Sequence, residues 1–139
     1  MKDENCAYCV EGELVEKFGI KITELPASKV YLFKEQSHKG RVIVASKHHV
    51  SEMIDLDRRE RQAFMDDVAK VASALRTLFR PTKINYGAYG DTGCHLHFHL
   101  VPKYADDAIE WVEPLRWIRS ARTFRIPNIR ILRRRSGRD

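Results

Sequence analysis

The sequence predicts a single α+β domain built on a mainly antiparallel sheet. Two strand-like segments precede one long amphipathic helix, and two more strand-like segments follow it. Of the 139 residues, 43% are hydrophobic and 32% are charged, which is enough to close one core beneath a polar surface. We therefore expect neither a multidomain protein nor a chain that is disordered throughout.

The first two strands are predicted over residues 28–34 and 40–45. Both segments are rich in β-branched and aromatic side chains. A polar stretch, residues 35–39, and then Gly40 separate them, which predicts a hairpin.

The helix is predicted to begin after Asp57, because Glu60 stands three residues later in the manner of a capping box. Pro81 should end it at about Phe79 or Arg80. Between these limits, apolar residues recur at spacings of three and four and form one stripe: Phe64, Val68, Val71, Ala72, Leu75 and Leu78.

Two further strands are predicted over residues 83–86 and 95–101, joined by the glycine-rich segment 87–93. The order of the four strands in the sheet does not follow from these patterns.

Three histidines alternate along the last predicted strand, at positions 95, 97 and 99. Alternate side chains of a strand share one face and lie roughly 6.6–7 Å apart, so the imidazoles could line one small anionic group. Imidazole titrates near neutral pH and can act as a nucleophile, a proton donor or a metal ligand. The alternative is an amphipathic strand whose histidines only face solvent.

This pattern resembles the histidine triad superfamily of nucleotide hydrolases and transferases. The resemblance spans about residues 5–111 and includes residues 40–44 before Lys47-His48-His49-Val50, the helix, Ile84-Asn85-Tyr86-Gly87, and Pro102-Lys103-Tyr104. It implies a five-stranded antiparallel sheet with a helix packed on it, and a homodimer.

The resemblance also implies a reaction. His97 would attack the α-phosphorus of a purine nucleotide, forming a nucleotidyl-histidine intermediate that water then cleaves. His99 would hydrogen-bond the phosphate oxygens, with His95 completing the triad. Asn85 matches a polar position that helps to orient the site, and Thr92 matches one that contacts the phosphate or the leaving group.

The loop before the triad matches the family in part. Gly90 would let backbone amides approach an anion, or would simply serve a tight turn. Asp91 stands where family members commonly have an amide side chain, and the loop is about one residue shorter than theirs. The identity of the leaving group therefore stays open. Glu35 and Gln36 fall where family members bind ribose, although a solvated turn is the alternative.

His99 stands where transferases of the superfamily have glutamine, which favours hydrolysis. The function expected is therefore hydrolysis of nucleoside phosphoramidates or dinucleoside polyphosphates. Nucleotidyl transfer is one alternative. A module that binds nucleotide or RNA without turnover is another.

Cys6 and Cys9 have the spacing of half a zinc site, and no second pair lies within zinc-finger distance. The resemblance implies that His49 and His95 complete it, as a closed structural zinc site. Two reduced thiols without metal are the alternative. We expect Cys94 to pack on the strand face opposite the histidines.

The formal charge of +6 is concentrated at the C-terminus. Residues 1–110 carry 16 Lys/Arg and 17 Asp/Glu, whereas residues 111–139 carry nine Arg and two acids. We therefore divide the chain into a domain at 1–111 and an Arg-rich extension at 112–139, and expect nucleic-acid binding only through the extension. That extension could be a basic arm, a disordered solvated segment, or the product of a shifted reading frame.

The sequence favours a cytoplasmic protein that does not enter a membrane. No apolar run approaches the roughly 18–20 residues of a membrane span, and the first ten residues lack the apolar region of a signal peptide. Three cysteines form an odd, sparse set rather than a disulfide framework.

Overall fold

A computed structural model of the chain describes residues 3–106 and contains one five-stranded sheet. Its strand order is β1-β2-β3-β5-β4, and all four neighbouring pairs are antiparallel. The pairing of β2 with β3 confirms the predicted hairpin, and the sheet confirms the α+β class. The strands are β1 (Gly19–Glu24), β2 (Ser28–Phe33), β3 (Val42–Ser46), β4 (Lys83–Gly87) and β5 (His97–Lys103).

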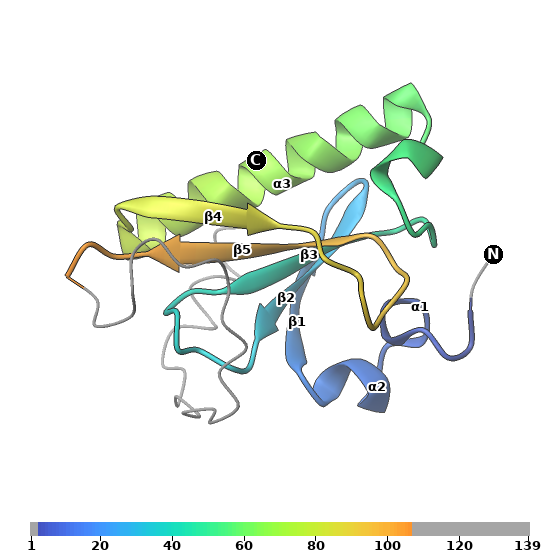
Figure 1. Cartoon of the computed structure of the whole chain (residues 1–139), viewed down its shortest axis with the longest axis horizontal. Helices are drawn as coiled ribbons and strands as arrows, with labels where there is room; N and C mark the ends of the chain where they lie inside the picture. Colours follow the sequence, from blue (N-terminus) through green and yellow to red (C-terminus); the bar gives the residue numbers. More distant parts are fainter. Residues whose placement is uncertain (1–2, 107–139) are drawn as a thin grey trace.

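The long helix α3 (Arg58–Phe79) covers one face of the sheet (Figure 1). The predicted capping box is present: the Glu60 amide donates to Asp57 Oδ1 at 2.8 Å, and the Asp57 amide donates to Glu60 Oε2 at 2.9 Å. The helix ends at Phe79, as predicted, and the next residue, Arg80, takes a left-handed conformation before Pro81. Its predicted stripe forms much of the main core, with Phe64, Val68, Ala72 and Leu75 buried.

The opposite face of the sheet is covered by the N-terminal segment. Two single-turn helices, α1 (Ala7–Val10) and α2 (Glu13–Glu16), lie on this side in Figure 1. Tyr8 and Val15 pack there with three residues of the sheet in a second apolar cluster, Tyr31, Ile43 and Ala45. Helices of four residues are too short for periodicity to reveal, so the sequence patterns did not predict them.

The predicted position of Cys94 is wrong. The strand β5 begins at His97 rather than His95, so Cys94 lies in the preceding loop and is exposed. A single-turn 3₁₀ helix, η1 (Met53–Asp55), precedes α3 in the chain. Because Cys94 is outside the strand, its side chain does not follow the alternation of strand residues between the two faces.

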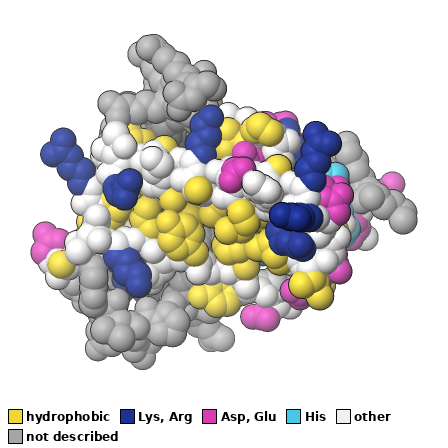
Figure 2. All heavy atoms as spheres, turned by 90° about the horizontal axis from the view of Figure 1, so that it is seen from above, with side chains coloured by type: hydrophobic (Ala, Val, Ile, Leu, Met, Phe, Trp, Pro, Cys, Tyr) yellow, Lys and Arg dark blue, Asp and Glu magenta, His cyan; other side chains and the backbone are white. Residues whose placement is uncertain are grey.

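The α3 side of the molecule, seen from above in Figure 2, carries a band of hydrophobic side chains between Lys and Arg side chains. Met65 on α3 is 38% exposed, and Tyr86 on the edge strand β4 is 53% exposed. Within residues 3–106, no helix is both long and apolar enough to cross a membrane. The extension at 112–139, and with it the boundary at 111, lies outside the described residues.

Glu11 fastens the N-terminal segment to the sheet. Its carboxylate accepts a hydrogen bond from the Tyr31 hydroxyl at 2.7 Å and pairs with Lys21 at 2.9 Å and Lys29 at 3.2 Å. Burial alone would raise the pKa of Glu11, but these hydrogen bonds and the lysine charges lower it to about 2. The backbone there has φ +62°, a conformation that non-glycine residues seldom adopt.

We predict that Glu11 makes the folded state sensitive to acid. A folded-state pKa near 2 lies below the unfolded value, so its stabilisation is complete above pH ~4.5 and is lost as the pH falls towards 2. Glu11→Gln should therefore lower the free energy of unfolding by about 1–2 kcal/mol at pH 7 and by much less at pH 2.5. Denaturant titration at both pH values measures this, with Glu13→Gln on the exposed side of α2 as the control. An equal loss at both pH values would contradict it.

Candidate functional site

The three histidines meet at one cavity, although only two of them lie in β5. His97 pairs with Ala45 and His99 with Ile43, which places both on the sheet face opposite α3. Their ring centroids are 5.2 Å apart. His95 precedes the strand, yet its ring joins the same cavity wall.

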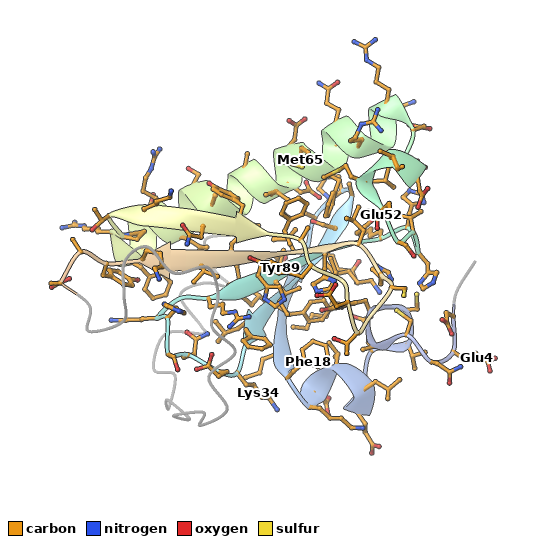
Figure 3. All side chains as sticks on the ribbon, in the orientation of Figure 1. Glu4, Phe18, Lys34, Glu52, Met65 and Tyr89 are labelled. Atoms are coloured by element: carbon orange, nitrogen blue, oxygen red, sulfur yellow. The ribbon has the colours of Figure 1, made fainter. Side chains whose placement is uncertain are left out.

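The cavity has a volume of about 600 Å³, within the range of small-molecule sites. Apolar side chains form one wall, and Thr92 and Gly93 of the loop before the triad also line the cavity. Figure 3 shows Phe18 on the side of the sheet away from α3. The apolar wall is formed by Tyr8, Phe18, Phe33 and Ile43.

The environment of His97 fixes its tautomer. Its Nδ1 lies 2.6 Å from the backbone carbonyl oxygen of His95. A carbonyl oxygen only accepts hydrogen bonds, so Nδ1 carries the proton and Nε2 keeps its lone pair. Burial lowers the pKa of His97, which keeps the ring neutral near pH 7. A neutral imidazole with a free lone pair on Nε2 is a nucleophile.

His99 has the opposite tautomer, because Arg41 occupies its Nδ1 side. The Arg41 Nη2 and Nε atoms lie 3.1 Å and 3.4 Å from His99 Nδ1. Guanidinium only donates, so Nδ1 accepts and a neutral His99 carries its proton on Nε2. Burial first, then the charges of Arg41 and His97, lower the pKa of His99 to about 3. Arg41 was not among the predicted site residues, although a charged residue at the start of an apolar strand is an indication of such a role.

Four potential metal ligands converge beside the triad. Cys6 Sγ lies 3.3 Å from His95 Nδ1, Cys9 Sγ lies 3.2 Å from His49 Nδ1, and the two Nδ1 atoms are 3.1 Å apart. All four ligand atoms lie within 4.8 Å of one another. Zinc bonds of about 2.3 Å to sulfur and 2.0–2.1 Å to nitrogen give tetrahedral edges of about 3.3–3.8 Å. The predicted ligands can therefore hold a metal ion.

The hydrogen bonds of this cluster also fit a cation. His95 Nε2 lies 2.7 Å from the carbonyl oxygen of Ser46, so Nε2 carries the proton and Nδ1 presents a lone pair to the cluster. That lone pair faces His49 Nδ1, and a cation between them would satisfy both nitrogens. His48 is exposed and lies 3.3 Å from Glu60, outside the cluster. Choosing His49 rather than His48 is therefore consistent with the geometry.

One of the predicted nucleotide contacts, Thr92, lies at the same cavity as the triad. Thr92 lines the cavity, and the neighbouring Gly90 takes φ +70°, a left-handed conformation that glycine adopts freely. Asn85 pairs with Val101 on the histidine face of the sheet, two residues before Gly87, which pairs with His99. Asn85 is not among the residues that line the cavity.

The predicted ribose contacts lie in the β2–β3 hairpin, where both are already engaged. The Gln36 amide nitrogen donates to the carbonyl oxygen of Arg41 at 3.0 Å, and its oxygen accepts from the Gly40 amide at 2.9 Å. Glu35 accepts from the Ser37 amide at 2.8 Å and lies 3.5 Å from Arg41 Nη1. Neither residue lines the cavity, so their binding of ribose stays a prediction.

Known proteins resemble this chain in both sequence and fold. A family model described as HIT domain matches residues 17–106. The chain is 26% identical over 114 residues to "Protein hit" of Bacillus subtilis, covering 73% of this chain and 72% of that protein. A histidine triad protein from Bradyrhizobium japonicum has a TM-score of 0.79 at 25% identity, covering 88% and 94% of the two chains. A HIT family protein from Bacillus anthracis has a TM-score of 0.63 at 25% identity, covering 81% and 83%.

We predict that the cluster binds one zinc ion per chain. Replacing a ligand leaves the remaining three unable to close the tetrahedron, so His49→Ala should lose most of the metal and lower the melting temperature. Metal analysis after dialysis measures this, and the exposed neighbour His48→Ala is the matched control. Thiol titration adds a second readout, because chelation should expose Cys6 and Cys9 while exposed Cys94 reacts throughout. Purified wild-type protein that holds no metal and shows three equally reactive thiols would contradict the prediction.

Proposed function

The chain belongs to the HIT domain family, and we propose that it hydrolyses purine nucleotides at the α-phosphorus with His97 as the nucleophile. Its substrates would be nucleoside phosphoramidates or dinucleoside polyphosphates. The observation that carries this proposal is the hydrogen bond from His97 Nδ1 to the His95 carbonyl oxygen, which leaves the Nε2 lone pair available inside a cavity lined by all three histidines.

The reaction would proceed in two displacements. His97 Nε2 attacks the α-phosphorus while the bond to the leaving group breaks, and the leaving group departs with the bonding electron pair and takes a proton from solvent. Water then attacks the same phosphorus and gives up a proton to solvent, the P–Nε2 bond breaks, and the electron pair returns to His97. The products are a nucleoside monophosphate and the protonated leaving group, and His97 regains the tautomer that its hydrogen bond to His95 favours.

Of the residues around His97, one would stabilise charge in the transition state and the others would bind the substrate. The Nε2–H of His99 would donate to a non-bridging phosphate oxygen, where charge develops as each displacement proceeds. Thr92 would contact the phosphate or the leaving group from the loop. The aromatic wall formed by Tyr8, Phe18 and Phe33 offers apolar surface for a purine base.

The metal would be held by Cys6, Cys9, His49 and His95. When bound, it would supply a fixed structural charge, because four protein ligands leave no position for substrate. His95 would then be held by its ring in the cluster and by its Nε2–H bond to Ser46, and its carbonyl oxygen would keep its place beside His97.

Hydrolysis of adenosine 5′-phosphoramidate tests the proposal. We predict release of AMP by the wild type, and a loss of at least about 10⁴-fold in kcat for His97→Ala, because no other group there replaces the nucleophile. His48→Ala, an exposed histidine outside the cavity, is the matched control and should retain full activity.

Three other outcomes would redirect or reject this assignment. Activity that survives in His97→Ala would contradict the nucleophile. Transfer of the nucleotide to an added phosphate acceptor in preference to water would support the transferase. If folded, metal-loaded protein cleaves neither phosphoramidates nor dinucleoside polyphosphates but binds nucleotide, the non-catalytic module would replace the enzyme.

We also propose that the protein is a homodimer. The edge strand β4 and the hydrophobic band of Figure 2 support this, since exposed Met65 and Tyr86 belong to α3 and β4. Light scattering should give twice the chain mass of 16.2 kDa. Tyr86→Asp should shift the mass towards one chain, whereas Ile54→Asp, exposed on η1, should not. A wild type that stays monomeric at 100-fold dilution and at high concentration alike would contradict the dimer.

A further inference from the structure

We propose that Arg41 is a positioning residue for His99: its guanidinium holds the imidazole proton on Nε2 and so fixes the hydrogen-bond donor that the triad offers to a phosphate. The effect of Arg41 on catalysis rests on the proposed function. The contact between Arg41 and His99 stands independently of it.

The hairpin holds Arg41 in one place. It directly precedes β3, and its side chain is only 4% exposed. The guanidinium carbon lies 4.1 Å from the centroid of the Phe33 ring, and Nη1 lies 3.5 Å from Glu35 Oε2. Gln36 fixes the backbone of the same residue by donating to its carbonyl oxygen. Stacking, an ion pair and a braced turn together orient the guanidinium.

A buried guanidinium is costly to keep, which argues that it does more than fill space. Burial lowers the pKa of Arg41 to about 10, partly offset by the charges of Glu35 and Tyr89. The group is still fully charged at pH 7. Replacing a whole buried ion pair with apolar side chains of similar size is often neutral for stability, so packing alone does not require the pair of Arg41 and Glu35 here.

The charge then acts on one nitrogen of His99. Both Nη2 and Nε point at Nδ1, and an imidazolium would have to place a proton between Nδ1 and the guanidinium. Arg41 and His97 are charged or titratable groups that act on His99, while Glu35 and Tyr89 act on Arg41. Phe33 packs edge-on against its ring, with the centroids 5.5 Å apart.

The result is a donor that does not change with pH. His99 stays neutral with Nε2 protonated throughout the physiological range, and the positive charge near the phosphate site belongs permanently to the buried arginine. A histidine left to itself would instead titrate near pH 6.5 and exchange its proton between two nitrogens.

The test reads the ring nitrogens of His99 directly by NMR of protein labelled with ¹⁵N-histidine, assigned with His99→Gln. We expect the wild type to show unprotonated Nδ1 and protonated Nε2 from pH 5.5 to 8. In Arg41→Met, which keeps volume and removes the charge and donors, His99 should populate both tautomers, and its pKa should rise while burial still holds it below that of a free histidine. Its kcat for the phosphoramidate should fall by about 10–100-fold with KM changed by less than about threefold.

Two further variants serve as a control and as a replacement for Arg41→Met. Arg61→Met removes an arginine that donates to the Met53 and Leu56 carbonyl oxygens away from the triad, and should alter neither the His99 tautomer nor kcat. If Arg41→Met does not fold, Arg41→Lys replaces it, since a single ammonium cannot make the same forked contact.

Three results would overturn the inference. These are a wild-type His99 protonated on Nδ1, a His99 tautomer and titration unchanged in the Arg41 variant that folds, and unchanged kcat in that variant. A wild type without hydrolase activity whose His99 nevertheless shows the expected tautomer would reject the proposed function while leaving the Arg41 contact intact.

Discussion

The hydrogen bond from His97 Nδ1 to the backbone carbonyl oxygen of His95 is the contact on which the rest of the site depends. It links two centres that share one short segment of chain. The His95 ring belongs to the Cys/His cluster, and its carbonyl oxygen fixes the tautomer of His97. Anything that moves His95 therefore alters both the cluster and the lone pair of the proposed nucleophile.

The layers of the fold hold this segment from both sides. The core beneath α3 anchors β5 through Phe98 and Leu100, which point away from the cavity. On the opposite face, Tyr8 packs against the rings of both His95 and His97, with centroids 5.2 Å and 5.1 Å away. Tyr8 stands between Cys6 and Cys9, so a metal held by those cysteines would also hold the aromatic wall against the triad.

The turn between β2 and β3 orients the other histidine of β5, His99, through Arg41. Gln36 and Glu35 brace the turn, and the turn presents Arg41 to His99. His97 and His99 consequently carry their protons on opposite nitrogens, although they are neighbours on one strand. His97 offers a lone pair that can attack phosphorus, and His99 offers a hydrogen-bond donor that can stabilise the charge on the phosphate oxygens.

The sequence predicted the features that arise from local rules. The capping box of Asp57 and Glu60 and the stripe through Phe64 fixed the helix, and alternation identified the histidines. The resemblance was needed to connect Cys6 with His49 and His95, because 43 and 89 residues separate them and spacing alone carries no such information.

The features that local sequence patterns did not predict depend on tertiary contacts. Cys94 was misplaced because the strand starts two residues later than its alternation suggested. The contact of Arg41 with His99 joins residues 58 positions apart, and only the pairing of β3 with β5 brings them together.

The stereochemistry of the reaction at phosphorus shows whether a covalent intermediate forms on His97. A nucleoside phosphoramidate made chiral at phosphorus with one sulfur would be hydrolysed in ¹⁸O-labelled water, and the configuration of the monophosphorothioate product determined. Two successive displacements, first by His97 and then by water, predict overall retention of configuration. Inversion would mean that water attacks the substrate directly, and would contradict a covalent intermediate on His97.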